Sequence, residues 1–211
     1  MKLHALDHRS AAWFATRRGM PTASQFHRII TQAGRPSSQA DLYRSELIAE
    51  KIFQCPMGRD VSGFPAVTHG IRTEPEACQM LEDMLGERLQ PGGFMTDDEG
   101  RYGASPDRLI IKGNRRELVE VKCPYEIPRH VCNLLYGPGD DHKAQIQGQL
   151  LISGFDRAHF FSYHPACPPR HMTIERDEKF IVHLAKELDA FCRQLQEDYL
   201  RARELGEWRT S

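Results

Sequence analysis

The chain has 211 residues, of which 40% are hydrophobic and 27% are charged, and its formal net charge is −1. This composition argues against a disordered chain, a collagen-like fibre or a coiled coil. Near-neutrality also argues against a protein that binds nucleic acid simply as a polycation. The length suits one domain with a sizeable core, and we expect a single domain over residues 1–211.

The neutral total conceals two oppositely charged segments. Residues 1–40 contain six basic residues and one acidic residue, a net of +5, whereas residues 74–99 contain eight acidic residues and one basic residue, a net of −7. Most such segregation reflects solvated surfaces. It is also the distribution that a protein needs when one surface faces an anion and another holds cations.

The sequence indicates no secretory signal and no membrane segment. Asp7 and His8 interrupt the N-terminal stretch, and no window approaches the ~18 apolar residues of a membrane span. The six cysteines are scattered without a CxxC pair, which argues against a disulfide framework or a four-cysteine metal site. We therefore expect a cytoplasmic protein with reduced thiols and no membrane contact.

Three helices are predicted from apolar residues at helical spacing. The first covers residues 42–53 and ends at Cys55-Pro56. A buried helix is predicted over residues 142–153, and a long amphipathic helix over about residues 177–205.

A further helix precedes Gly86, and its start has two possible positions. Thr73 and Glu76 match a capping box, which would start the helix one residue after Thr73. The alternative is a start near Thr68, which would place Pro75 inside the helix and strain it.

A strand-rich region separates these helices. It begins at Gly92-Gly93, and a Gly113-Asn114 loop can join its first two strands as a hairpin. The predicted strands cover residues 102–111, 116–122, 159–163 and 171–175. Helices before and after a central mixed sheet predict an α/β fold.

The hairpin places two acidic residues opposite each other. If Gly113 and Asn114 form the loop, Asp107 lies directly across from Glu120. The Cβ atoms of such a pair are roughly 4.5–5.5 Å apart, and two like charges there are destabilising. A divalent cation would compensate this repulsion.

Two neighbouring groups extend the predicted site. Lys122 lies on the same strand face as Glu120, and the Val121 carbonyl is a further hard oxygen ligand. Asp followed by Glu-x-Lys is the arrangement of metal-dependent phosphodiester cleavage, in which lysine orients or deprotonates the attacking water. The alternative is a surface hairpin whose acids pair with Arg115, Arg116 or Lys122.

SPDRL at residues 105–109 and ELVEVKCP at residues 117–124 resemble the PD-(D/E)XK nuclease signature of the lambda exonuclease and YqaJ-type viral recombinase family. Four more segments resemble that family in the same order: WFATRRGMPTAS (13–24), HGIRTE (69–74), HKAQIQ (142–147) and IERDEKF (174–180). The resemblance implies a restriction-endonuclease-like α/β core over about residues 68–175. One departure is Arg108, which stands where glycine is common.

The resemblance also implies a metal site for Mg²⁺, with two ions expected and Mn²⁺ able to substitute. The implied ligands are Asp107, Glu120, the Val121 carbonyl and Glu74. The implied catalytic residues are Asp107, Glu120, Lys122, Glu74 and Gln145. Glu74 could instead complement the helix dipole, and Gln145 could be a structural amide. Gln149, one turn after Gln145, is predicted to be structural.

DNA contacts are implied at four positions. Arg17, Ser24 and Ser105 match residues that bind the 5′-terminal phosphate, and guanidinium and hydroxyl donors suit a phosphate. The alternative for Arg17 is a solvated charge, and the neighbouring Arg18 is a possible register error. Arg129 is expected to contact the DNA backbone.

The implied function is a Mg²⁺-dependent 5′-to-3′ exonuclease that acts on double-stranded DNA from phosphorylated 5′ ends. It would release mononucleotides and leave a 3′ single strand for recombination. The implied partners are DNA ends, a single-strand annealing protein and two further copies in a homotrimeric ring, in a bacterial cytoplasm of phage or prophage origin. Alternatives are a structure-specific or restriction-type endonuclease and a non-catalytic scaffold that binds DNA ends.

Overall fold

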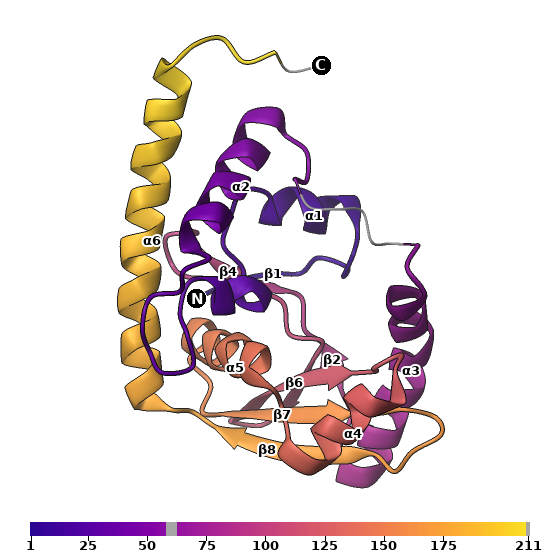
Figure 1. The fold of residues 1–211 in the computed structure, drawn as a ribbon. Coiled ribbons are helices and arrows are strands. Elements are labelled where there is room, and N and C mark those ends of the chain that lie inside the picture. The colour runs from indigo at the N-terminus through magenta and orange to yellow at the C-terminus, as the bar shows by residue number, and fades with distance from the viewer. Residues whose placement is uncertain (58–62, 210–211) are drawn as a thin grey trace.

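The computed structural model describes residues 1–57 and 63–209, which form a mixed α/β fold around two sheets (Figure 1). The larger sheet contains, in spatial order, β2 (Gln90–Pro91), β5 (Arg108–Lys112), β6 (Arg115–Lys122), β7 (Arg157–Ser162) and β8 (Arg170–Glu175). The smaller sheet contains β1 (Lys2–His4), β3 (Phe94–Thr96) and β4 (Gly103–Ala104). Strands β6 and β7 are parallel, whereas the other pairs of the larger sheet are antiparallel.

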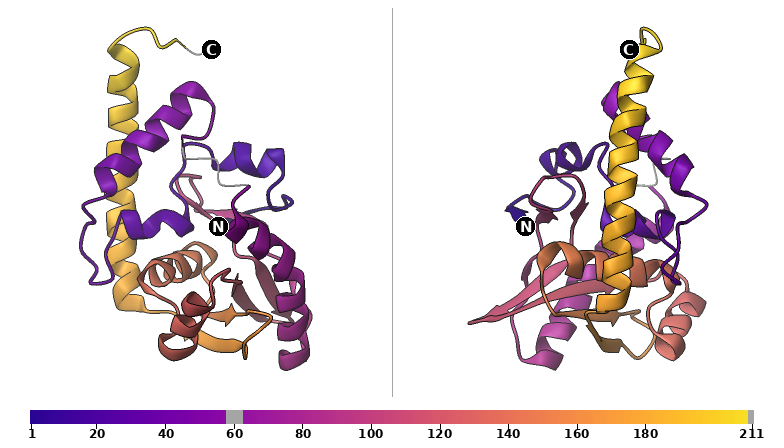
Figure 2. Two further views of the ribbon diagram at one scale, coloured as in Figure 1. Left: turned by 45° about the vertical axis from the view of Figure 1, so that its right-hand side comes forward. Right: turned by 90° about the vertical axis from the view of Figure 1, so that its left-hand side faces the viewer.

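Helices cover both faces of the larger sheet (Figures 1 and 2). They are α1 (Ala11–Arg17), the 3-10 helix η1 (Ala23–Arg28), α2 (Ala40–Phe53), α3 (Pro65–Leu85), α4 (Ile127–Tyr136), α5 (Asp140–Ser153) and α6 (Glu178–Glu204). Figure 2 shows α6 running along one side of the molecule with α2 beside it, and the Tyr43 and Phe191 rings stack there at 5.6 Å.

The alternation of side chains along the strands divides the core in two. Leu118 and Phe160 pack in one cluster with residues of α5 and α6, including Leu150. Val119 faces the other way and packs in a second cluster with α3. Glu120 and Lys122 share the α5 side with Leu118, so the sheet directs the predicted catalytic residues toward α5.

Helix α3 starts earlier than the capping box predicts. It begins at Pro65, runs through Pro75 and ends at Gly86, which has a φ of 63°. The start after Thr73 was therefore wrong, and the earlier start was the better alternative. Pro75 has no N–H to donate, but Ala77 and other α3 residues bury against the sheet, and this packing outweighs the local cost.

The predicted strand over residues 102–111 was also wrong as a single element. It divides at Pro106, so that β4 joins the smaller sheet and β5 joins the larger one. The hairpin register was correct, because Arg108 pairs with Val119 and Lys112 pairs with Arg115. The structure confirms, within a few residues, the three helices predicted over residues 42–53, 142–153 and about 177–205. It also confirms the strands predicted over residues 159–163 and 171–175. All six cysteines are free, and no helix among the described residues is long and apolar enough to cross a membrane.

Candidate active site

Asp107, Glu120 and Lys122 meet at one end of the β5–β6 hairpin. The Val121 N–H donates to Asp107 Oδ2 at 2.7 Å, and Lys122 Nζ donates to Glu120 Oε1 at 2.6 Å. The Glu120 residue is only 2% exposed. The predicted register therefore brings both carboxylates and the lysine together.

The charges in this group are not balanced. Burial raises the pKa of Asp107 well above its usual range, and the neighbouring Glu120 charge raises it further. Burial acts to lower the pKa of Lys122, but the charges of Glu120 and Asp107 outweigh it, so that the pKa is raised. Two carboxylates facing one ammonium group leave one carboxylate without a countercharge.

This donor set fits a hard divalent cation such as Mg²⁺. It comprises two carboxylates and the Val121 carbonyl, because the N–H and C=O of one strand residue point to the same neighbouring strand. Within residues 1–57 and 63–209, no cluster of three or more His, Cys, Asp or Glu side chains is arranged to hold a metal. The site therefore depends on main-chain and amide groups as well as on carboxylates.

Glu74 lies beside this group but has another partner. Arg108 Nη2 forms an ion pair with Glu74 Oε1 at 3.0 Å, and Arg108 Nη1 donates to the Asp107 carbonyl at 2.7 Å. The arginine that replaces the glycine common in the resembled family thus links α3 to the strand that carries Asp107.

Two amides of α5 hold the other side of Glu120. Gln145 Nε2 donates to Glu120 Oε1 at 2.6 Å, and Gln149 Nε2 donates to Glu120 Oε2 at 2.7 Å. Gly148 lies between them, and a Cβ there would be 2.4 Å from Phe26 Cδ2 of η1. Glycine is required at this position because it lets α5 and η1 approach closely.

The predicted phosphate residues come from α1, η1 and the loop before β5. Ser10 caps α1 by accepting the Trp13 N–H, and the Arg17 guanidinium at the other end of α1 stacks 3.7 Å from the Trp13 ring centroid. Burial lowers the pKa of Arg17 to about 10. Its hydrogen bond is to Thr22 Oγ1 at 3.4 Å. The charge of Glu50 acts to raise the Arg17 pKa, but Arg17 forms no ion pair with a carboxylate among the described residues.

The two predicted phosphate-binding serines differ in their contacts. Ser24 Oγ lies 3.5 Å from Thr22 Oγ1. Ser105 Oγ accepts from Trp13 Nε1 at 3.0 Å and donates to the Gly93 carbonyl at 2.7 Å. Ser105 therefore holds the Trp13 ring on which Arg17 stacks, and its binding of a phosphate stays a prediction.

One cavity of about 260 Å³ joins the two groups. Its walls include residues of both predicted sets: Arg17, Ser24, Ser105, Asp107, Glu120, Lys122 and Gln145. Arg129 lines a separate pocket with Tyr136. His8, Arg9 and Gln149 also line the cavity and were missed as site residues. Arg9 has a left-handed φ of 66°, which is uncommon without glycine, and the basic character of residues 1–40 was the available signal.

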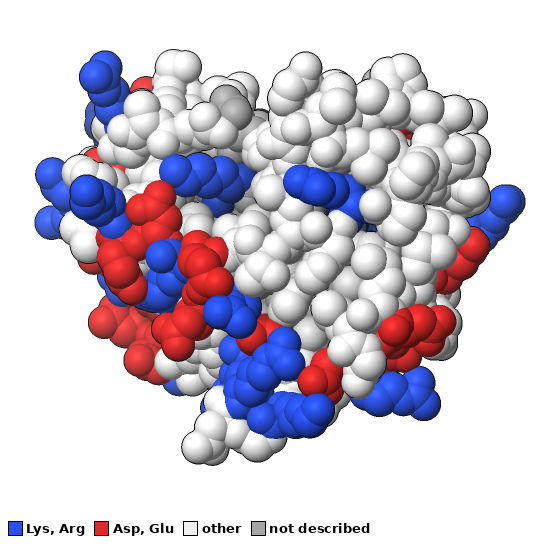
Figure 3. Space-filling view, turned by 90° about the horizontal axis from the view of Figure 1, so that it is seen from below, with Lys and Arg blue, Asp and Glu red and all other residues white. Residues whose placement is uncertain are grey.

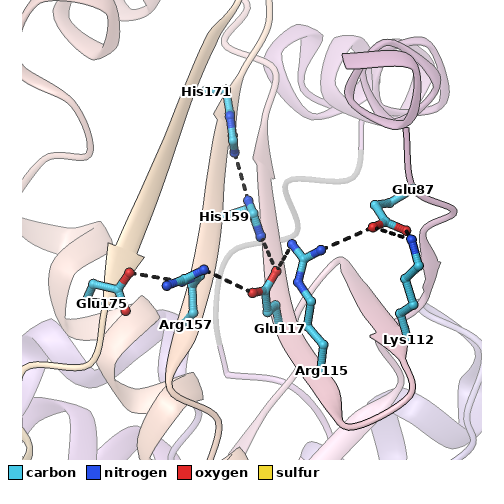
Figure 4. Close-up of polar contacts among 8 residues, drawn as sticks. All are labelled: Glu87, Lys112, Arg115, Glu117, Arg157, His159, His171 and Glu175. Carbon is cyan, nitrogen blue, oxygen red and sulfur yellow. Dashed lines mark hydrogen bonds and ion pairs between the residues drawn. The ribbon is translucent and has the colours of Figure 1, made fainter. Parts of the chain in front are cut away.

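A second polar cluster lies on the opposite face of β6 and was not predicted (Figure 4). This Glu117 cluster comprises Glu87, Lys112, Arg115, Glu117, Arg157, His159, His171 and Glu175. His159 bridges Glu117 Oε2 at 2.7 Å and His171 Nε2 at 2.8 Å. Figure 3 shows acidic and basic side chains interspersed on the underside of the molecule, as is typical of a solvated surface.

Comparisons with known proteins identify the fold and the family of the chain. An alkaline exonuclease (LHK-Exo) from Laribacter hongkongensis, which was also solved in complex with dAMP, is 26% identical with a TM-score of 0.80, and the match covers 93% of this chain and 100% of that one. A phage-related exonuclease from Haemophilus somnus 129PT is 16% identical with a TM-score of 0.68, covering 89% and 96% of the two chains. These neighbours confirm the restriction-endonuclease-like fold. No curated protein matches the chain. The sequence model of the YqaJ-like viral recombinase domain matches residues 12–156, and the chain therefore belongs to that family.

Proposed function

We propose that the protein is a divalent-metal-dependent exonuclease that degrades double-stranded DNA in the 5′-to-3′ direction from phosphorylated 5′ ends. The observation that carries the proposal is one cavity that joins an undercompensated carboxylate pair to Arg17, which forms no ion pair with the described residues. One group suits a cation and the other suits a phosphate, and a DNA end has a terminal phosphate near its first scissile bond. The similarity to LHK-Exo, solved with the mononucleotide dAMP, supports release of mononucleotides.

The residues of the cavity divide the reaction between them. Arg17 binds the terminal phosphate, and Trp13 holds the guanidinium in place. Asp107, Glu120 and the Val121 carbonyl would hold Mg²⁺ or Mn²⁺, with Glu74 beside a second ion. When bound, the metal polarises the phosphodiester and lowers the pKa of a bound water. Lys122, whose Nζ donates to Glu120 Oε1, orients the attacking water and stabilises the developing charge.

The assembly and the partner are further parts of the proposal. Membership of the YqaJ-like family supports a homotrimeric ring around DNA and a single-strand annealing protein that receives the 3′ strand. Light scattering on the purified protein gives the number of subunits directly.

The deciding assay is digestion of linear duplex DNA that carries either a 5′-phosphate or a 5′-hydroxyl, with a covalently closed circle as the third substrate. We expect Mg²⁺-dependent loss of the phosphorylated linear strand, and Lys122→Ala to abolish it. Equal attack on the closed circle would favour an endonuclease. Binding to DNA ends without hydrolysis at any metal concentration would favour the scaffold.

The phosphate assignment has a matched control in the neighbouring arginine. Arg17→Ala should remove the preference for 5′-phosphate, whereas Arg18→Ala, whose guanidinium contacts Gln54 at 3.4 Å, should retain it. Undiminished preference in Arg17→Ala would refute the assignment.

A further inference from the structure

Glu120 is held from both sides, and each of its oxygens has different donors. Oε1 accepts from Lys122 Nζ and Gln145 Nε2, both at 2.6 Å. Oε2 accepts from Gln149 Nε2 at 2.7 Å, which is its one hydrogen bond from the described residues. Gln149 is 1% exposed, so water cannot easily take its place.

The orientation of the Gln149 amide follows from this contact. The opposite orientation would set the amide oxygen against a carboxylate oxygen, and the two would repel. In the orientation that donates to Glu120, Gln149 Oε1 is buried and has no hydrogen-bond partner among the described residues. Gln149 also lines the cavity that contains Asp107 and Lys122. A buried acceptor at such a wall suits a donor inside the cavity, such as a water molecule.

We propose that Gln149 is a positioning residue of the cation site, which fixes the Glu120 carboxylate for a divalent cation and accepts a hydrogen bond from a water in the cavity. The inference rests on the proposed function, because it assigns the cation to the same site. Gln145 alone would leave the carboxylate free to rotate about its last bond, since its amide and Lys122 both bind Oε1. Gln149 removes that freedom by holding Oε2.

Gln147 provides a matched control on the same helix. It is 3% exposed, and its amide contacts the Glu175 carbonyl at 3.0 Å and the Asp177 N–H at 2.9 Å, away from Glu120. Replacing either glutamine with methionine keeps the length of the side chain and removes the amide. If both glutamines are merely structural, the two substitutions should change Mn²⁺ affinity alike. If Gln149 positions Glu120, only Gln149→Met should weaken Mn²⁺ binding.

The test is a calorimetric titration of the full-length protein with Mn²⁺ in the absence of DNA, together with the Mg²⁺ dependence of digestion. We expect Gln149→Met to weaken Mn²⁺ binding about tenfold and to raise the half-saturating Mg²⁺ concentration by a similar factor. The KM for phosphorylated duplex should stay unchanged at saturating Mg²⁺. Gln147→Met should lower the melting temperature and leave Mn²⁺ affinity unchanged.

Unchanged Mn²⁺ affinity in Gln149→Met, or equal weakening in both folded variants, would overturn the inference. Wild-type protein that binds no Mn²⁺ would overturn it together with the cation site. If the wild-type protein binds Mn²⁺ but does not digest DNA, the proposed nuclease activity is refuted and the cation site is not. In that case the difference in Mn²⁺ affinity between the two variants would still decide the role of Gln149.

Discussion

Strand β6 carries two buried glutamates three residues apart, and their surroundings differ. Glu117 accepts from Arg115 at 2.6 Å, lies 2.7 Å from His159 Nε2 and pairs with Arg157 at 3.5 Å. Burial acts to raise the Glu117 pKa, but the hydrogen bonds from Arg115 and His159 outweigh it and lower the pKa to about 2. Glu120, on the other face, shares one lysine with Asp107, whose pKa is raised by burial and by Glu120.

The difference lies in the countercharge that surrounds each carboxylate. The Glu117 cluster contains three carboxylates and three basic side chains besides its two histidines, so its charge is balanced without a ligand (Figure 4). The group at Asp107 and Glu120 has two carboxylates for one lysine, so it lacks a countercharge that a bound cation would supply. Burial and acidity are common to both groups, and the missing countercharge is the observation that supports the proposed cation site at Asp107 and Glu120.

The largest expected effect is that of Asp107→Asn. The substitution removes a proposed metal ligand, so digestion should fall by roughly 10³-fold. It also removes a buried charge beside Glu120, so the melting temperature in EDTA should rise. Single-turnover digestion and thermal unfolding in EDTA measure the two effects. A clear loss of stability in EDTA would show that Asp107 is compensated as Glu117 is.

Glu117→Gln should have the opposite effects: a loss of stability and little change in digestion. The pKa difference between about 2 and the ordinary value of 4.5 corresponds to up to about 3 kcal/mol of stability at neutral pH, at about 1.4 kcal/mol per unit. Urea unfolding at pH 7 should show this loss, while digestion by the folded variant stays near the wild-type rate. A large loss of activity in folded protein would mean that the two faces of β6 are coupled.

The same group predicts how stability depends on pH. The folded-state pKa of Glu117 lies below the unfolded value, so its contribution is present above pH 4.5 and disappears as the pH falls toward 2. Glu117→Gln should therefore lose less stability than the wild type over this range. Parallel curves of unfolding free energy against pH would contradict the assigned pKa.

The sequence was sufficient for the part of the site that depends on local geometry. A two-residue loop at Gly113-Asn114 fixes the register, and the register places Asp107 near Glu120. The start of α3 that the capping box predicts was wrong because that prediction used local geometry alone. The local rules for capping and for Pro75 hold, but burial against the sheet outweighs them.

The remaining features depend on contacts between distant segments. Glu117 and His159 are 42 residues apart, so no spacing in the sequence connects them. Gln149 was expected to be structural because its position on α5 reveals the face that it shares with Gln145 but not the contact of its amide with Glu120 Oε2. Arg9 lines the cavity from a residue with a left-handed φ, and the basic character of residues 1–40 does not predict this backbone conformation.

The smallest expected effect is at the rim of the Glu117 cluster. Lys112 contacts Glu87 at 3.0 Å, but its side chain is 68% exposed, and exposed ion pairs contribute about 0.2–1 kcal/mol. Lys112→Ala should therefore destabilise the protein by less than about 0.5 kcal/mol in urea unfolding, and added salt should reduce the effect. A loss as large as that of Glu117→Gln would mean that the rim and the buried carboxylate act as one network. The compensation of the Glu117 charge would then depend on exposed residues of the cluster as well as on Arg115 and His159, unlike the surroundings of Glu120.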